Sequence, residues 1–159
     1  MKRGYTMDAI DRKIVSLLQG NGRLSQEALA QQVHLSRPAV HERIKRLEEQ
    51  GILRGYQALI DWEALGLPIT AFIWVRTSGT QCNEIGHILM QLGNQESMIE
   101  ECHRVTGEWC MLLKVRVALP LTLQELIDRI RAVPDVQATM TTLALSTLSA
   151  RESGDEVSA

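Results

Sequence analysis

Three side chains that can donate hydrogen bonds to nucleic acid recur at helical spacing within residues 36–50. Arg37, His41 and Lys45 stand at i, i+4 and i+8, so they share one stripe of a helix. Basic side chains donate to phosphate oxygens and to base-edge acceptors in the major groove. A separate apolar stripe, which predicts packing on a core, is formed by Val40, Ile44 and Leu47. The pattern favours a helix that is buried on one side and contacts DNA on another.

Two further short helices are expected to position this one. Asp8 is a predicted N-cap for a helix over residues 9–19, and Ser25 opens a second helix. Ser36 caps the third helix, and Pro38 lies in its first turn, where a missing N–H costs nothing. A short helix, a tight turn and a capped helix together predict a helix-turn-helix unit.

The turn between the second and third helices contains a residue with an unusual backbone preference. His34 occupies a position that favours glycine, and histidine is one of the few other residues enriched in the left-handed conformation. Gly51 is expected to end the third helix in the same conformation. Residues 52–60 are expected to be extended, with a turn at Arg54 and Gly55.

Charge divides the chain unevenly, although the net charge is only -2. Residues 1–60 hold ten Lys and Arg against six Asp and Glu, whereas residues 61–159 hold seven against thirteen. Either chance or a division into two domains explains this asymmetry. With two domains, only the first is expected to bind a polyanion.

The remainder alternates strands and helices. The predicted order is β-α-β-β-α-β, the split βαβ arrangement of ferredoxin-like domains, with elements at residues 69–77, 81–92, 97–105, 109–117, 122–131 and 135–146. Thr122 and Glu125 predict a capping box for the second helix of this series. The fold class is therefore α+β, with domains at 1–60 and 69–148, a linker at 61–68 and a disordered tail at 149–159.

Two helices cover only one face of a four-stranded sheet, yet alternation predicts apolar residues on both faces. One face carries Ile73, Val75, Met111, Leu113 and Val115. The other is expected to carry Leu145, Cys110, Thr141 and the four residues of a predicted dimer interface, Phe72, Trp74, Leu112 and Leu143. The alternative is that the linker of the same chain covers this second face.

The ordered motifs resemble the Lrp/AsnC family of bacterial and archaeal transcription regulators over roughly residues 7–148. The first part carries Asp8, Asp11, Lys13-Ile14, Gly22-Arg23-Leu24-Ser25, Leu29-Ala30, Leu35-Ser36, Arg43-Ile44, Arg46-Leu47-Glu48 and Gly51-Ile52. The second part carries Leu65-Gly66-Leu67, Val105-Thr106-Gly107, Leu112-Leu113-Lys114-Val115 and residues 136–141.

The resemblance implies a winged helix-turn-helix regulator that binds double-stranded DNA as a homodimer or as a larger assembly such as an octamer. Arg43 and Arg46 flank the basic stripe and are expected to reach phosphates, and Ser36 begins the helix where N–H groups suit a phosphate. The predicted DNA-contacting set is Ser36, Arg37, Pro38, His41, Arg43, Lys45, Arg46 and Arg54.

Family members often respond to a small amino acid, which sits near a Gly-x-x-Asp turn between dimers. Here Cys110 stands where that Asp is expected, and a neutral thiol cannot pair with a ligand ammonium as a carboxylate does. Glu108 is a candidate substitute. The expected effector set is Gly107, Glu108, Trp109, Cys110, Thr139 and Thr141. We expect a weak response or none, with some preference for apolar amino acids.

Two other functions are alternatives to a transcription regulator. Siroheme decarboxylases resemble this two-domain architecture, but no catalytic set stands out here, and the basic helix is complete. A ligand-sensing module that acts by assembly alone does not explain the basic first part. No enzyme activity or cofactor is expected. A metal site is not expected either, because the spacing around Cys102, His103 and Cys110 matches no zinc pattern.

The three cysteines and the apolar runs indicate the cellular compartment in which the protein is expected. Cys82, Cys102 and Cys110 form an odd, scattered set, which favours reduced thiols in a cytoplasmic protein. Cys102 and Cys110 are expected to face each other across a hairpin. No apolar run approaches the roughly 18 residues of a membrane span.

Overall fold

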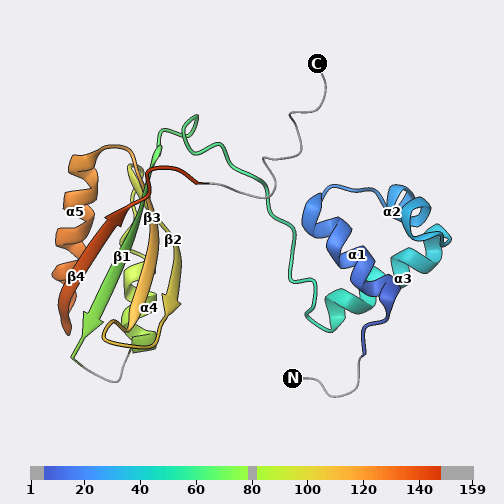
Figure 1. Cartoon of the computed structure of the whole chain (residues 1–159), viewed down its shortest axis with the longest axis horizontal. Coiled ribbons are helices and arrows are strands. Elements are labelled where there is room, and N and C mark those ends of the chain that lie inside the picture. Colours follow the sequence, from blue (N-terminus) through green and yellow to red (C-terminus); the bar gives the residue numbers. More distant parts are fainter. Residues whose placement is uncertain (1–5, 79–81, 148–159) are drawn as a thin grey trace. The chain divides into compact units, whose positions relative to one another are not determined.

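The structure, a computed structural model, describes residues 6–78 and 82–147 (Figure 1). The chain forms two compact units, and the division falls between Leu59 and Ile60. Within the described ranges, none of the helices has the length and apolar character needed to cross a membrane. The tail predicted at 149–159 lies outside the described residues.

The first unit contains three helices, which confirm the predicted helix-turn-helix order. They are α1 (Ala9–Gly20), α2 (Gln26–Val33) and α3 (Arg37–Glu49). The predicted caps are present, because Ser25 and Ser36 each accept a hydrogen bond from a backbone N–H three residues ahead. Asp8 and Asp11 form a reciprocal capping box at the start of α1.

One apolar cluster holds the three helices of this unit together. Its buried members are Ile14, Leu18, Leu29, Ala30, Val33, Val40, Ile44 and Leu47. The predicted apolar stripe of α3 is therefore confirmed, and it fixes which side of α3 remains exposed to solvent.

The turns around α3 have the predicted left-handed backbone. His34 has φ 55° and ψ 44°, and Gly51 has φ 70°. Residues 52–60 join no sheet, since every strand of the described chain belongs to the second unit. Tyr56 attaches this segment to α3, because its hydroxyl donates to Glu48 Oε1 at 3.1 Å.

The second unit has the predicted β-α-β-β-α-β order. Its elements are β1 (Ile69–Thr77), α4 (Cys82–Met90), β2 (Ser97–Arg104), β3 (Met111–Val117), α5 (Pro120–Arg131) and β4 (Val136–Leu143). The sheet order is β2-β3-β1-β4, with every neighbouring pair antiparallel. Both helices pack on one face, since Leu89 of α4 and Leu126 of α5 join the cluster around Ile73 and Leu113.

The predicted start of α5 is wrong. The helix begins at Pro120, its N-cap is Leu119, and no side chain caps it. Thr122 lies inside the helix with only 3% of its surface exposed, so it cannot serve as the cap. Proline has a helical φ already fixed, and a first-turn residue needs no N–H donor, so Pro120 can begin the helix.

Two residues of β4 lie on the other face from the one predicted. Thr141 pairs with Ile73 and Leu143 pairs with Ala71, and directly paired residues share a face. Both therefore lie on the helix-covered side. Met140 pairs with Trp74 and Thr142 pairs with Phe72, so these two residues of β4 lie on the uncovered face, the side of the sheet without helices.

Candidate nucleic-acid interface

The exposed side of α3 carries most of the predicted DNA-contacting residues. The side chains of Ser36, Arg37, Pro38, His41, Lys45 and Arg46 are all exposed. Ser36 Oγ accepts from the Ala39 N–H at 3.4 Å, so the hydroxyl orders the helix start and leaves other first-turn N–H groups facing solvent. Arg54 is also exposed, in the segment that follows α3.

The imidazole of His41 is oriented by a residue that the sequence did not single out. The Gln26 side-chain amide donates to His41 Nδ1 across 3.1 Å, linking the first residue of α2 to the middle of α3. When Nδ1 accepts a hydrogen bond, the neutral ring carries its proton on Nε2. His41 is thereby prepared to act as a donor. No sequence pattern points to Gln26, because its contact with His41 depends on how α2 crosses α3.

A groove runs beside this basic stripe. Its volume is about 250 Å³, and it is lined by Leu18, Gly22, Leu24, Gln26, Leu29, His41, Ile44, Lys45, Glu48 and Tyr56. Tyr56 forms one wall, and burial followed by its hydrogen bond to Glu48 raises the pKa of its hydroxyl. His41 and Lys45 both line this groove and are exposed, so their side chains lie at the border between the groove and solvent.

The placement of Arg43 differs from the prediction. Its Nη1 lies 2.7 Å from Asp8 Oδ2 and 2.7 Å from Asp11 Oδ1, and the Asp11 side chain is only 2% exposed. Arg43 thus joins α3 to the start of α1 rather than projecting toward a phosphate. The Asp11 N–H and the Arg43 guanidinium lower the pKa of Asp8 below its ordinary value of 3.8.

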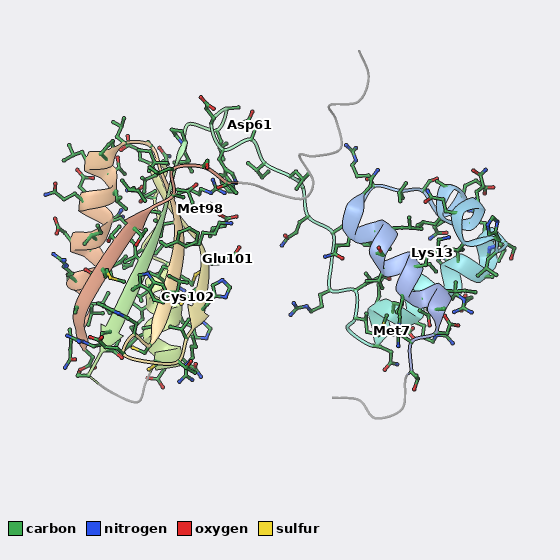
Figure 2. All side chains as sticks on the ribbon, in the orientation of Figure 1. Met7, Lys13, Asp61, Met98, Glu101 and Cys102 are labelled. Carbon is green, nitrogen blue, oxygen red and sulfur yellow. The ribbon has the colours of Figure 1, made fainter. Side chains whose placement is uncertain are left out.

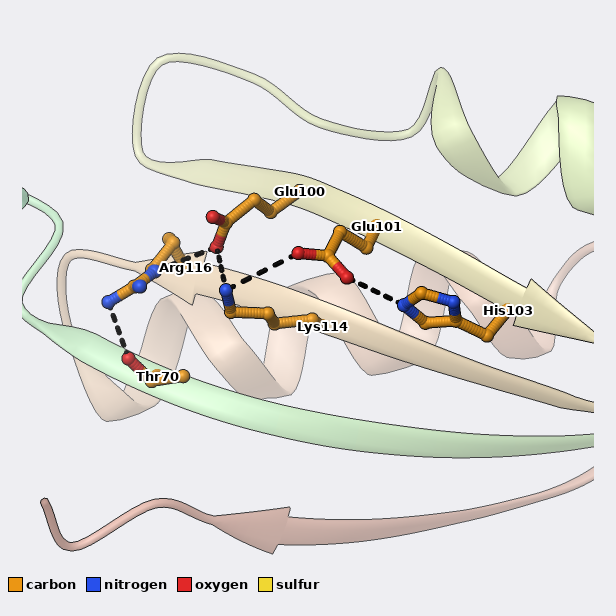
Figure 3. Close-up of polar contacts among 6 residues, drawn as sticks. All are labelled: Thr70, Glu100, Glu101, His103, Lys114 and Arg116. Carbon is orange, nitrogen blue, oxygen red and sulfur yellow. Dashed lines mark hydrogen bonds and ion pairs between the residues drawn. The ribbon is translucent and has the colours of Figure 1, made fainter. Parts of the chain in front are cut away.

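The uncovered face of the sheet combines apolar and charged residues. Phe72, Trp74 and Leu112 are half-buried, and Met140 is 43% exposed. The charged part, shown in Figure 3, joins Lys114 Nζ to Glu100 Oε2 at 3.1 Å and to Glu101 Oε1 at 3.5 Å.

The same charged network continues along β3 and β2. Arg116 Nε lies 3.1 Å from Glu100 Oε2, Arg116 Nη1 donates to Thr70 Oγ1 at 2.7 Å, and His103 Nε2 lies 2.6 Å from Glu101 Oε2. A bulge in β2 falls between Ile99 and Glu101, which lets two consecutive glutamates, Glu100 and Glu101, both reach Lys114. The guanidinium of Arg116 also lies 5.1 Å from the ring centre of Trp62.

The expected effector residues do not gather at a single point. Arg76 Nη1 donates to Glu108 Oε1 at 2.9 Å, and the Arg76 guanidinium carbon lies 5.7 Å from the centre of the Trp109 ring. Gly107, two residues before Trp109, has a φ of 111°. Glu108 is therefore already paired with a cation. Arg76 is a further member of this group that sequence patterning missed.

The other three expected effector residues belong to the helix-covered side of the sheet. Thr139 Oγ1 accepts from Arg131 Nε at 2.8 Å, Thr141 is paired with Ile73, and Cys110 packs against the core. The prediction that Cys110 faces Cys102 is wrong, because the Cys110 sulfur contacts Thr77 instead. Among the described residues, no three His, Cys, Asp or Glu side chains lie close enough together to hold a metal ion.

A helix-turn-helix unit followed by an antiparallel sheet with two helices defines a two-domain class of DNA-binding regulator. Residues 7–54 match the winged helix-turn-helix DNA-binding family, and residues 70–153 match the Lrp/AsnC ligand binding domain. The chain belongs to the Lrp/AsnC family of transcription regulators.

Individual relatives and structures agree with this assignment. The chain is 32% identical over 141 residues to the HTH-type transcriptional regulator FL11 of Pyrococcus horikoshii, covering 89% of this chain and 91% of that one. It is 40% identical over 120 residues to the leucine-responsive regulatory protein of Haemophilus influenzae, covering 74% and 70%. A feast or famine regulatory protein from M. tuberculosis complexed with L-methionine has a TM-score of 0.82 at 35% identity, covering 92% and 97%.

Proposed function

We propose that this chain recognises a specific double-stranded DNA sequence through the exposed side of α3, and that it does so as a homodimer. The observation that carries the proposal is the separation of the two sides of α3. Val40, Ile44 and Leu47 are buried, while Arg37, His41 and Lys45 are exposed. A helix of this kind can enter the major groove without losing its core contacts.

The charges around α3 favour contact with a polyanion. Arg43 pairs with both Asp8 and Asp11, so its positive charge offsets one of their two negative charges and reduces their repulsion of an approaching phosphate. Residues near the N-terminus of a recognition helix contact base edges, which assigns base reading to Arg37. Lys45 and Arg46 lie farther along α3 and are assigned to phosphates, which fix position but carry no sequence information.

Replacing Arg37 with alanine is expected to weaken specific DNA binding by about 1–3 kcal/mol and to relax the preference at one base position. Arg46→Ala is expected to weaken binding to all sequences alike and to flatten its salt dependence. Fluorescence anisotropy with the preferred duplex and a scrambled duplex, each at several salt concentrations, measures both effects.

Arg131→Ala is the matched control, since it removes the same charge from an exposed residue of the second unit. It should leave the affinity for both duplexes unchanged. If Arg37→Ala keeps both the affinity and the base preference of the unaltered protein, Arg37 does not read DNA.

The homodimer is proposed to form through the uncovered sheet face. Phe72, Trp74, Leu112 and Met140 place apolar surface there, and neither helix of the second unit covers it. Trp62 lies against Arg116, so this described part of the linker covers the charged end rather than the apolar one. Two copies packed face to face remove the apolar patch from water.

We further propose that a small amino acid is at most a weak ligand of the second unit. The L-methionine complex of a similar structure supports the ligand class. Glu108, however, is occupied by Arg76, and Cys110 supplies no carboxylate for a ligand ammonium. Calorimetric titration with a panel of amino acids is expected to give millimolar affinity or none, and tighter binding in Cys110→Asp. Micromolar binding to the unaltered protein, lost in that variant, contradicts the proposal.

A further inference from the structure

Several hydrogen bonds converge on the sulfur of Cys110, which directly precedes β3. The Thr77 N–H donates to it at 3.2 Å, and Thr77 Oγ1 lies 3.3 Å away. The Cys110 thiol in turn lies 3.4 Å from the carbonyl oxygen of Val75, to which its S–H donates. A sulfur with a backbone N–H and a hydroxyl directed at it has donors in place to stabilise a negative charge.

A second thiol belongs to the same cluster. Cys82, the first residue of α4, is buried, and its sulfur lies 3.7 Å from Thr77 Oγ1. The Cys82 side chain also acts on the Cys110 thiol and helps to lower the pKa of that thiol. Thr77 therefore contacts both sulfurs, so two cysteines that are 28 positions apart in the sequence are brought together by β1, α4 and the start of β3.

The two environments distinguish Cys110 from Cys102. Burial alone raises the pKa of the Cys110 thiol, but the hydrogen bonds from Thr77 and Cys82 outweigh burial and lower it. Cys102 lies on β2 (Figure 2), and its sulfur packs beneath Gly86 of α4, where burial raises the pKa of its thiol. Since the thiolate is the reactive form, oxidation should be selective for Cys110, which is also partly exposed.

We propose that Cys82 and Cys110 form a reversible intramolecular disulfide, in which Cys110 reacts first with a hydroperoxide and Cys82 resolves the product. In the first step the Cys110 sulfur attacks one peroxide oxygen, the O–O bond breaks, and hydroxide leaves and takes up a proton. In the second step the Cys82 sulfur attacks Cys110, the S–O bond breaks, and the Cys82 proton leaves with the hydroxide as water. Two thiols and one hydrogen peroxide become one disulfide and two waters.

This bond would connect the first residue of α4 to the loop that ends at Cys110. The same loop carries Glu108 and Trp109, which surround Arg76. Oxidation would therefore restrain a surface loop of the second unit, and a cytoplasmic dithiol system could reverse it. The DNA-binding proposal does not depend on this chemistry.

The test treats the full-length protein with stoichiometric hydrogen peroxide, alkylates the remaining thiols under denaturing conditions and identifies the peptides by mass spectrometry. The expected product is a Cys82–Cys110 disulfide that reductant removes, with Cys102 recovered as the alkylated thiol. Cys102→Ser should give the same product as the unaltered protein. Dimedone, which traps sulfenic acid, should label Cys110 in Cys82→Ser at least about tenfold faster than Cys102.

Two results would overturn the proposal. One is a disulfide in which Cys102 takes part as often as Cys82, or disulfides that form only between chains. The other is equal dimedone labelling of Cys102 and Cys110 in Cys82→Ser. Circular dichroism of each variant, matched to the unaltered protein, confirms that its fold is intact before the thiols are compared.

Discussion

A Trp74→Asp variant is expected to be monomeric at concentrations where the unaltered protein is a dimer. Trp74 lies on the uncovered face of the sheet, between Leu112 on β3 and Met140 on β4. In a face-to-face dimer, the new carboxylate would be buried without a partner, which costs several kcal/mol. We expect the dimer dissociation constant to rise by roughly 100-fold or more.

Light scattering coupled to size exclusion measures this change. Leu121→Asp is the matched control, because it places the same charge on a leucine of α5 that is 64% exposed, outside the proposed interface. The control should remain dimeric. A folded monomer of the unaltered protein at micromolar concentration would remove the basis for the proposed interface.

An Arg43→Met variant is expected to lose about 3 kcal/mol of folding free energy in the first unit, because it removes the guanidinium from an ion pair with a buried carboxylate. The carboxylate is Asp11, which is 2% exposed and lies 2.7 Å from Arg43. Methionine keeps much of the side-chain length, so the lost stability reflects the missing charge rather than missing side-chain volume. Urea unfolding followed by circular dichroism provides the measurement.

Arg12→Met is the control for this variant, because Arg12 is exposed on α1 and loses the same charge. It should change the unfolding midpoint little. Acid provides a second check, because folding lowers the pKa of Asp8. The stability that ionised Asp8 contributes is therefore present above pH 3.8 and is lost as the pH falls through the lower pKa of the folded state. Equal midpoints for Arg43→Met and Arg12→Met at neutral pH would contradict the assigned role of Arg43.

The local features of the first unit could be predicted because each depends on neighbouring residues. Ser25 and Ser36 cap helices through contacts three residues ahead, and His34 adopts the left-handed turn through its own backbone preference. The apolar stripe of α3 follows from helical periodicity alone. None of these features requires knowledge of how one helix crosses another.

The features that sequence reasoning missed depend on contacts between distant elements. Arg43 looks like a surface residue of α3 until α1 brings Asp8 and Asp11 beside it. Thr141 could occupy either face of β4, because threonine suits both faces of a strand and the register decides which one it takes. Only the fold shows that Thr77 lies between two cysteines.

Selection of duplexes from a random pool by the full-length protein tests the central claim most directly. We expect an enriched motif with two half-sites related by two-fold symmetry, their centres about 34 Å or a multiple of that distance apart along the DNA. Repeating the selection with Arg37→Ala should remove the preference at one position of each half-site. Enrichment of no motif by the unaltered protein, or an unchanged motif for Arg37→Ala, would contradict DNA reading by α3.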